Sequence, residues 1–174
     1  SSDLYIGADP ANIDRLQPVI KFFYQHAFDR LMQTAQDLGY SKENKGVCLF
    51  LDEFYSFGRL ETLVSCMPYF RGYKIKLFLI TSDIERVEKI YGEVNTNSII
   101  SDCSTKIVFA SRSYKTAKKV SQIYPDKPVQ EIMNLSSDSQ IILRDDEKPV
   151  IAKKFFYYAD EEMKEKIVKP VALC

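Results

Sequence analysis

The feature that most constrains this sequence is a run of five apolar residues, Val47–Leu51, followed directly by Asp52 and Glu53. The run has no alternation of apolar and polar residues, so a strand formed here would be apolar on both faces. Such strands are typical of parallel sheets with helices on both faces. The run therefore predicts a buried strand with two carboxylates at its carboxyl end, where α/β proteins bind ligands.

Strand and helix patterns alternate along the first two thirds of the sequence. Two more apolar runs, at 75–80 and 106–110, predict strands that are parallel neighbours of the first. A short strand is also expected at 4–7. Helices are expected over residues 18–38, 60–67, 83–91, 95–102 and 114–123. This order is typical of a doubly wound α/β sheet with helices on both faces.

The first helix has clear start and stop signals. Asp9 and Pro10 read as an N-cap followed by proline at the first helical position. Pro18 predicts that the long helix begins there, after one short turn, because proline inside a helix costs about 3 kcal/mol. Gly39 is the expected stop.

The last third of the sequence has a different pattern. Segments 140–143 and 150–158, separated by a polar turn, predict an antiparallel hairpin. Residues 155–158 are all aromatic, and alternation along a strand predicts that half of them pack in the core. The polar tail, 161–169, has oppositely charged residues at helical spacing.

The acidic pair gives the sequence its chemical interpretation. Apolar residues followed by Asp-Glu have the form of a Walker B strand. Asp52 could then sit in the second shell of a Mg²⁺ ion that bridges the nucleotide phosphates, and Glu53 could orient or deprotonate the attacking water. The simpler alternative is an acidic end on a core strand, and the motif alone leaves it open.

The sequence contains no phosphate-binding loop of the form G-x-x-x-x-G-K-[ST]. This chain alone is therefore not expected to bind ATP tightly. Either the fold is degenerate, or the loop belongs to sequence outside the chain.

The motifs around the acidic pair, taken in order, carry a resemblance to a known family. They lie at residues 4–16, 49–60, 72–76, 88–92, 97–103, 116–117, 152–154 and 157–158. Together they resemble the TraG-like type IV coupling proteins of conjugation and type IV secretion, over residues 4–160.

The resemblance implies membrane-anchored, RecA-like hexameric ATPases that use ATP and Mg²⁺ to bring DNA or protein substrates to a secretion channel. It implies that the chain, residues 1–174, is one domain: the Walker B portion of the nucleotide-binding domain. The Walker A loop, an inserted all-alpha domain and a transmembrane anchor would lie upstream. The implied fold is an incomplete, mostly parallel RecA-like sheet of the P-loop NTPase type plus a C-terminal hairpin, on the cytoplasmic side of the bacterial inner membrane.

The resemblance also assigns roles to single residues. Asp52 matches the Walker B aspartate, beside the metal, and Glu53 matches the catalytic glutamate. Arg71 stands where related motors carry an arginine that reaches the γ-phosphate of the neighbouring subunit, and Arg59 is the alternative. Ser82 falls where the family usually has a nucleotide-sensing glutamine, and it is shorter and lacks the amide donor.

Two functions remain open from the sequence. The first is an energy-transducing ATPase fragment of a secretion complex. The second is a catalytically weak RecA-like module that contacts secretion components or substrates, which Ser82 favours. The 24 basic and 24 acidic residues balance, so any nucleic-acid role must come from a local patch or from parts of the protein outside this sequence. No apolar run reaches the length of a membrane span.

Overall fold

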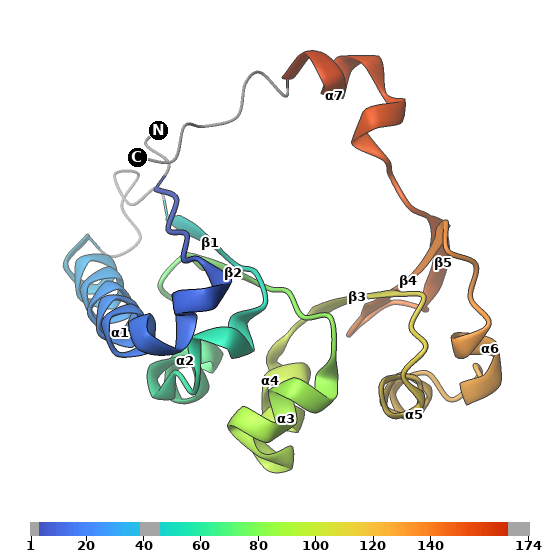
Figure 1. Ribbon diagram of the computed structural model, residues 1–174, viewed down its shortest axis with the longest axis horizontal. Helices are drawn as coiled ribbons and strands as arrows, with labels where there is room; N and C mark the ends of the chain where they lie inside the picture. Colours follow the sequence, from blue (N-terminus) through green and yellow to red (C-terminus); the bar gives the residue numbers. More distant parts are fainter. Residues whose placement is uncertain (1–3, 39–45, 167–174) are drawn as a thin grey trace. The chain divides into compact units, whose positions relative to one another are not determined.

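The computed structural model describes residues 4–38 and 46–166. They belong to two compact units, Ser1–Ser104 and Thr105–Cys174, and each unit is described by itself. Figure 1 shows the course of the helices and strands along the chain. The expected stop of the first helix at Gly39 and the end of the tail, beyond residue 166, lie outside the described residues.

The first unit begins without the strand expected at 4–7, and this prediction is wrong. Leu4, Tyr5 and Ile6 are exposed and have no regular secondary structure. A strand needs a hydrogen-bonded neighbour, and no described residue pairs with this segment. The 3-10 helix η1 (Pro10–Asn12) follows, and Asp9 caps it by accepting a hydrogen bond from Ala11 N–H at 2.9 Å, as expected.

The long helix α1 (Ile13–Leu38) begins before Pro18 and not at it. The prediction of a break at Pro18 is therefore wrong. Pro18 is the sixth residue of the helix, so its missing N–H removes only one early hydrogen bond, that to Asp14. The apolar face of the following turns still packs on the core, because Ile20, Tyr24 and Phe28 are buried.

The sheet of the first unit is a parallel pair, β1 (Val47–Leu51) and β2 (Ile75–Leu79). Its register pairs Val47 with Ile75 and Leu51 with Leu79, which confirms the prediction that these two strands are parallel neighbours. The first unit therefore combines a small parallel sheet with helices, as the α/β prediction requires.

The two faces of this pair differ within the described residues. One face joins a core cluster in which Leu51 and Ile75 are buried together with Phe28 and Phe70, whose rings stack at 5.2 Å. The other face carries Phe50 and Phe78, stacked at 4.5 Å and exposed by 64% and 48%. Both faces of the strand pair were expected to be buried, and among the described residues one face is buried and the other is exposed.

Short helices connect and follow the two strands. They are η2 (Phe54–Phe57), α2 (Glu61–Cys66), η3 (Met67–Tyr69), α3 (Ile84–Tyr91) and α4 (Glu93–Asp102). The start of α3 is as predicted, because the Asp83 side chain accepts a hydrogen bond from Glu85 N–H at 2.9 Å. Gly92, with φ 78°, ends α3 and begins α4.

The second unit contains an antiparallel sheet with the order β3-β4-β5: β3 (Thr105–Phe109), β4 (Ser139–Arg144) and β5 (Val150–Lys153). The hairpin prediction is confirmed, although β5 ends at Lys153 and not at residue 158. The third apolar run was expected to be a parallel neighbour of the first two strands. It forms β3 instead, which pairs antiparallel with β4. An apolar run predicts that a strand is buried, but which strand pairs with it depends on the rest of the chain.

Two helices, α5 (Tyr114–Ile123) and α6 (Val129–Met133), form a core cluster with β4. Its buried members include Val120, Ile141 and Leu143. The chain continues through η4 (Tyr157–Ala159) to α7 (Glu161–Lys166). The four aromatic residues at 155–158 are all exposed, so the prediction that half are core is wrong. The strand ends before them, and strand alternation therefore does not apply.

Candidate functional site

The acidic pair lies at the carboxyl end of β1, as the sequence predicts. Backbone pairing continues just past the strand ends: Ile80 N–H donates to the Leu51 carbonyl at 3.0 Å, and Phe54 N–H donates to the Ile80 carbonyl at 3.3 Å. These bonds fix the backbone on both sides of Asp52 and Glu53. Asp52 is exposed to solvent, and Glu53 is partly buried.

Glu53 turns back across the edge of the sheet. One of its carboxylate oxygens, Oε2, accepts a hydrogen bond from Ser82 N–H at 3.2 Å. The Glu53 backbone is left-handed, with φ 45° and ψ 48°, which is uncommon for a residue other than glycine. Backbone strain of this kind occurs most often at functional sites. The structure thus brings together two predicted site residues, Glu53 and Ser82.

The contact from Ser82 differs from the one that the sequence suggested. The prediction concerned the serine side chain, whereas the group that donates to Glu53 is the backbone N–H. The signal that could have found it is the strand register. Setting Val47 beside Ile75 in a parallel pair places the residues after β1 next to those after β2.

Arg71 lies at the other end of the sheet. It belongs to the turn between η3 and β2, so it precedes the strand whose carboxyl end carries Ser82. The five residues of β2 span about 15 Å. The structure therefore does not bring Arg71 to the acidic pair of the same chain.

Arg59 is held by contacts within its own unit. Its Nε donates to Glu61 Oε1 at 2.6 Å, and an Nη donates to the Tyr91 carbonyl at 2.8 Å, at the end of α3. The hydrogen bond with Glu61 raises the pKa of Arg59 and lowers the pKa of the Glu61 carboxyl. These contacts favour a role in joining α2 to α3.

One arginine near the acidic pair was not singled out from the sequence. Arg86, in the first turn of α3, donates to the Tyr55 hydroxyl at 3.2 Å and lies 5.7 Å from the centre of that ring. Tyr55 is two residues after Glu53. Arg86 therefore brings a positive charge to the carboxyl edge of the sheet, and its position at the start of the helix after β2 is the signal that could have found it.

The metal-binding capacity of this edge is small. The described parts of the chain contain no group of three or more His, Cys, Asp or Glu side chains that could hold a metal ion. Mg²⁺ usually keeps several waters and binds through one or two carboxylates plus substrate phosphates. The exposed carboxylate of Asp52 fits a role in the second shell of such an ion, with the direct ligands coming from nucleotide and water.

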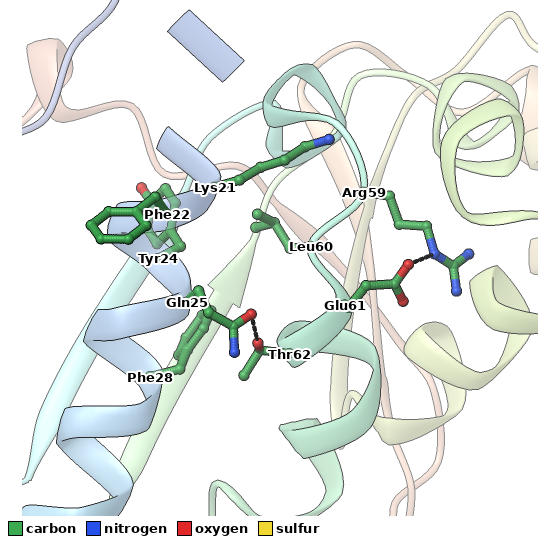
Figure 2. Close-up of a pocket in the computed structure, with 9 residues that line it drawn as sticks. All are labelled: Lys21, Phe22, Tyr24, Gln25, Phe28, Arg59, Leu60, Glu61 and Thr62. Atoms are coloured by element: carbon green, nitrogen blue, oxygen red, sulfur yellow. Dashed lines mark hydrogen bonds and ion pairs between the residues drawn. The ribbon is translucent and has the colours of Figure 1, made fainter. Parts of the chain in front are cut away.

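A cavity of about 280 Å³ lies elsewhere in the first unit, between α1 and the segment that leads into α2. Figure 2 shows Lys21 at one side, and Arg59 paired with Glu61 at another. Gln25 and Thr62 are joined by a hydrogen bond. Its lining residues are Lys21, Phe22, Tyr24, Gln25, Phe28, Arg59, Leu60, Glu61 and Thr62. The acidic pair does not line this cavity.

Comparison with models of protein families shows the family to which the chain belongs. The model of the family "Type IV secretory system Conjugative DNA transfer" matches residues 1–127 and 127–174. The chain therefore belongs to this family of coupling proteins for conjugative DNA transfer. None of the described helices is long and apolar enough to cross a membrane.

Two relatives show how much of such a protein the chain represents. It is 27% identical over 125 residues to the conjugal transfer protein TraG of Escherichia coli. The aligned region covers 69% of the chain and 20% of TraG. It is 21% identical over 123 residues to the protein VirD4 of Agrobacterium fabrum, covering 71% of the chain and 18% of VirD4. The chain thus spans about a fifth of the length of these relatives.

Solved structures of the plasmid coupling protein TrwB share the fold. A TrwB complex with the non-hydrolysable GTP analogue GDPNP has a TM-score of 0.63 at 13% identity, covering 80% of the chain and 38% of TrwB. A TrwB complex with ADP and Mg²⁺ has a TM-score of 0.62 at 15% identity and the same coverage.

Proposed function

We propose that this chain is the Walker B portion of the nucleotide-binding domain of a coupling ATPase, with residues 1–174 acting as part of one domain. ATP hydrolysis by the full-length protein would drive DNA or protein substrates into a type IV secretion channel. The observation that carries the proposal is the position of Glu53, at the carboxyl end of a parallel strand and hydrogen-bonded to Ser82 N–H. The family match and the nucleotide-bound TrwB structures support it.

Two side chains have chemical roles in this proposal. Glu53 accepts a proton from the attacking water, because a carboxylate at the strand end faces the ligand edge of the sheet. Asp52 would hold waters of the Mg²⁺ coordination shell by hydrogen bonds. Mg²⁺, when bound with ATP, neutralises charge on the phosphate oxygens.

The phosphate-binding loop comes from a part of the protein outside this sequence, since the chain contains no such motif. The proposed full-length protein has that Walker A loop upstream, an inserted all-alpha domain and a membrane anchor. It forms a homohexamer at the cytoplasmic side of the bacterial inner membrane. Its partners are the DNA or protein substrate and other secretion components. Arg71, remote from its own acidic pair, acts on the neighbouring subunit, and Arg59 is the alternative.

The test is a set of three substitutions in the full-length protein. Glu53→Gln should keep nucleotide binding and lower turnover at least about 100-fold, because the amide cannot accept the proton of water. Asp52→Ala should also weaken Mg²⁺-dependent nucleotide binding. Glu93→Gln, at an exposed acid in the first turn of α4, is the matched control and should hydrolyse ATP normally.

A second candidate function is a RecA-like interaction module with weak or no hydrolysis. The serine at position 82 favours it, because a serine side chain cannot replace the amide donor of the expected glutamine. If the wild-type full-length protein binds its secretion partners and hydrolyses no ATP in the assembled ring, this second function is correct and the first is wrong.

A further inference from the structure

The turn that follows β2 is braced by a side chain to which no role has been assigned. The Thr81 hydroxyl accepts a hydrogen bond from Asp83 N–H at 3.2 Å. It also donates a hydrogen bond to the Asp83 carbonyl at 3.1 Å. Thr81 is partly buried, whereas Ser82, between the two bonded residues, is exposed. One hydroxyl therefore closes the backbone around Ser82.

The same turn is fixed at its other end by helix α3. The Asp83 side chain accepts from Glu85 N–H at 2.9 Å and so anchors the turn to the first residues of the helix. Within this turn the Ser82 N–H donates a hydrogen bond to Glu53 Oε2 at 3.2 Å. Strand, turn and helix together determine where that N–H lies.

We propose that Thr81 is a positioning residue for Glu53, acting through the backbone of Ser82. The Thr81 hydroxyl holds the turn, the turn presents the Ser82 N–H, and this N–H holds one carboxylate oxygen of Glu53. The other oxygen, Oε1, is then directed to the attacking water. This inference rests on the proposed function.

In this mechanism the group that holds the turn is the hydroxyl at position 81. A carboxylate has two oxygens, so one can be anchored while the other accepts a proton. Without the hydrogen bonds of the Thr81 hydroxyl, the Glu53 side chain samples orientations in which neither carboxylate oxygen faces the attacking water. Small misplacements of catalytic groups have large effects on rate, up to about 100-fold for 1 Å.

The kinetic experiment uses the full-length protein and three variants. Thr81→Val removes the hydroxyl with almost no change of shape, and it should lower kcat about tenfold with the KM for ATP unchanged. Thr81→Ser keeps the hydroxyl and should restore kcat. Thr105→Val makes the same change at an exposed threonine with no assigned role, at the start of β3, and should behave as wild type. If Thr81→Ser does not restore kcat, or if Thr105→Val lowers kcat as much as Thr81→Val does, the proposal is overturned.

A double-mutant comparison separates this inference from the proposed function. In the Glu53→Gln background, Thr81→Val should cause no further loss, because the group that it positions no longer acts as a base. If Glu53→Gln alone hydrolyses ATP normally, the proposed function fails. If Glu53→Gln is inactive and Thr81→Val is fully active, only the positioning role fails.

A structural measurement keeps the proposal testable if Thr81→Val does not fold. Hydrogen exchange of the Ser82 amide should be slow in the full-length wild-type protein and at least about tenfold faster in Glu53→Ala, which removes the acceptor. Unchanged exchange of this amide in Glu53→Ala would show that the N–H does not hold the carboxylate, and would overturn the proposal.

Discussion

At the scale of single residues, Tyr91 connects the parts of the first unit around the acidic edge. Its side chain is only 1% exposed, and its hydroxyl accepts from Leu60 N–H at 3.3 Å and donates to the Gly58 carbonyl at 3.4 Å. Its ring also packs against Phe54, directly after Glu53, at 5.7 Å. Burial raises the pKa of Tyr91 above the ordinary 10.0, because the charged phenolate is poorly solvated there.

This shift predicts how stability depends on alkaline pH. Because the folded-state pKa is raised, the contribution of neutral Tyr91 to stability is complete below pH 10.0 and is lost as the pH rises through the raised value. Tyr91→Phe should cost about 1 kcal/mol at neutral pH, from its lost hydrogen bonds, and should reduce the alkaline loss.

Urea unfolding at neutral pH and above pH 10.0 measures both effects. Tyr157→Phe, at an exposed tyrosine, is the control and should change neither value. Tyr24→Phe is the comparison variant, since burial also raises the pKa of Tyr24. An alkaline loss of the same size in Tyr91→Phe and wild type would contradict the prediction.

Sequence reasoning at this scale succeeded where the physics is local. The caps at Asp9 and Asp83 were predicted, because a capping side chain bonds to a backbone N–H two or three residues on. The contact between Glu53 and Ser82 N–H was not predicted in its detail. It joins two residues that are 29 positions apart, and it depends on the pairing of β1 with β2 and on a left-handed backbone at Glu53. Neither the pairing nor the backbone conformation follows from residue types.

At the scale of elements, the beginnings of β1 and β2 meet at two residues with left-handed backbones. Gly46 has φ 75°, Lys74 has φ 55°, and Val47 N–H donates to the Lys74 carbonyl at 3.1 Å. A Cβ at Gly46 would lie 2.5 Å from the Lys74 carbonyl oxygen. The parallel pair can therefore start in this register only with glycine at position 46.

We expect Gly46→Ala to destabilise the chain by about 2 kcal/mol, from the left-handed backbone and the backbone clash together. The matched control is Gly7→Ala, at a position where a Cβ would have no neighbour within 4 Å. It should leave stability unchanged within about 0.5 kcal/mol. Denaturant midpoints of the two variants measure the difference, and equal midpoints would show that the strand start can shift to accommodate a side chain.

The elements that were predicted correctly are those specified by their own sequence. Helix α5 and helix α3 have apolar periodicity and N-caps, and both were found where expected. The strand formed by the third apolar run was also found, but its partner was wrong. Strand β3 pairs with β4, which belongs to the hairpin between residues 139 and 153. An apolar run carries no information on which strand lies beside it.

At the scale of the whole molecule, the chain carries one edge of the proposed nucleotide site and no phosphate loop. We therefore expect no measurable binding of ATP–Mg²⁺ by the 174-residue chain. The carboxylates alone repel the phosphates, and no cradle of backbone N–H groups offsets that repulsion. Calorimetric titration is the measurement, with the full-length protein as the positive control. Micromolar affinity of the chain would reveal a phosphate-binding segment of another form.

The assembled ring supplies the test for Arg71. Arg71→Ala should lower turnover in the assembled ring about 1000-fold or more, because an arginine supplied in trans acts only on the neighbouring subunit. Mixing full-length Glu53→Gln subunits with full-length Arg71→Ala subunits should restore part of the activity, since some interfaces then combine an intact Glu53 with an intact Arg71.

The control is a mixture of Glu53→Gln subunits with subunits carrying both substitutions, which should remain inactive because every intact Arg71 then faces a neighbour that lacks Glu53. Normal hydrolysis by Arg71→Ala alone would leave Arg71 as a surface residue and make Arg59 the next residue to test.

The stacked pair Phe50 and Phe78 affects the solubility of the isolated chain. The two rings are exposed on a short sheet, and the outer edges of its strands pair with no other strand among the described residues. Such surfaces favour self-association of the chain. Light scattering should show self-association that grows with concentration and with added sulfate. Phe78→Lys, on the face away from the core cluster, should improve solubility, and purification of the 174-residue chain could begin from that variant.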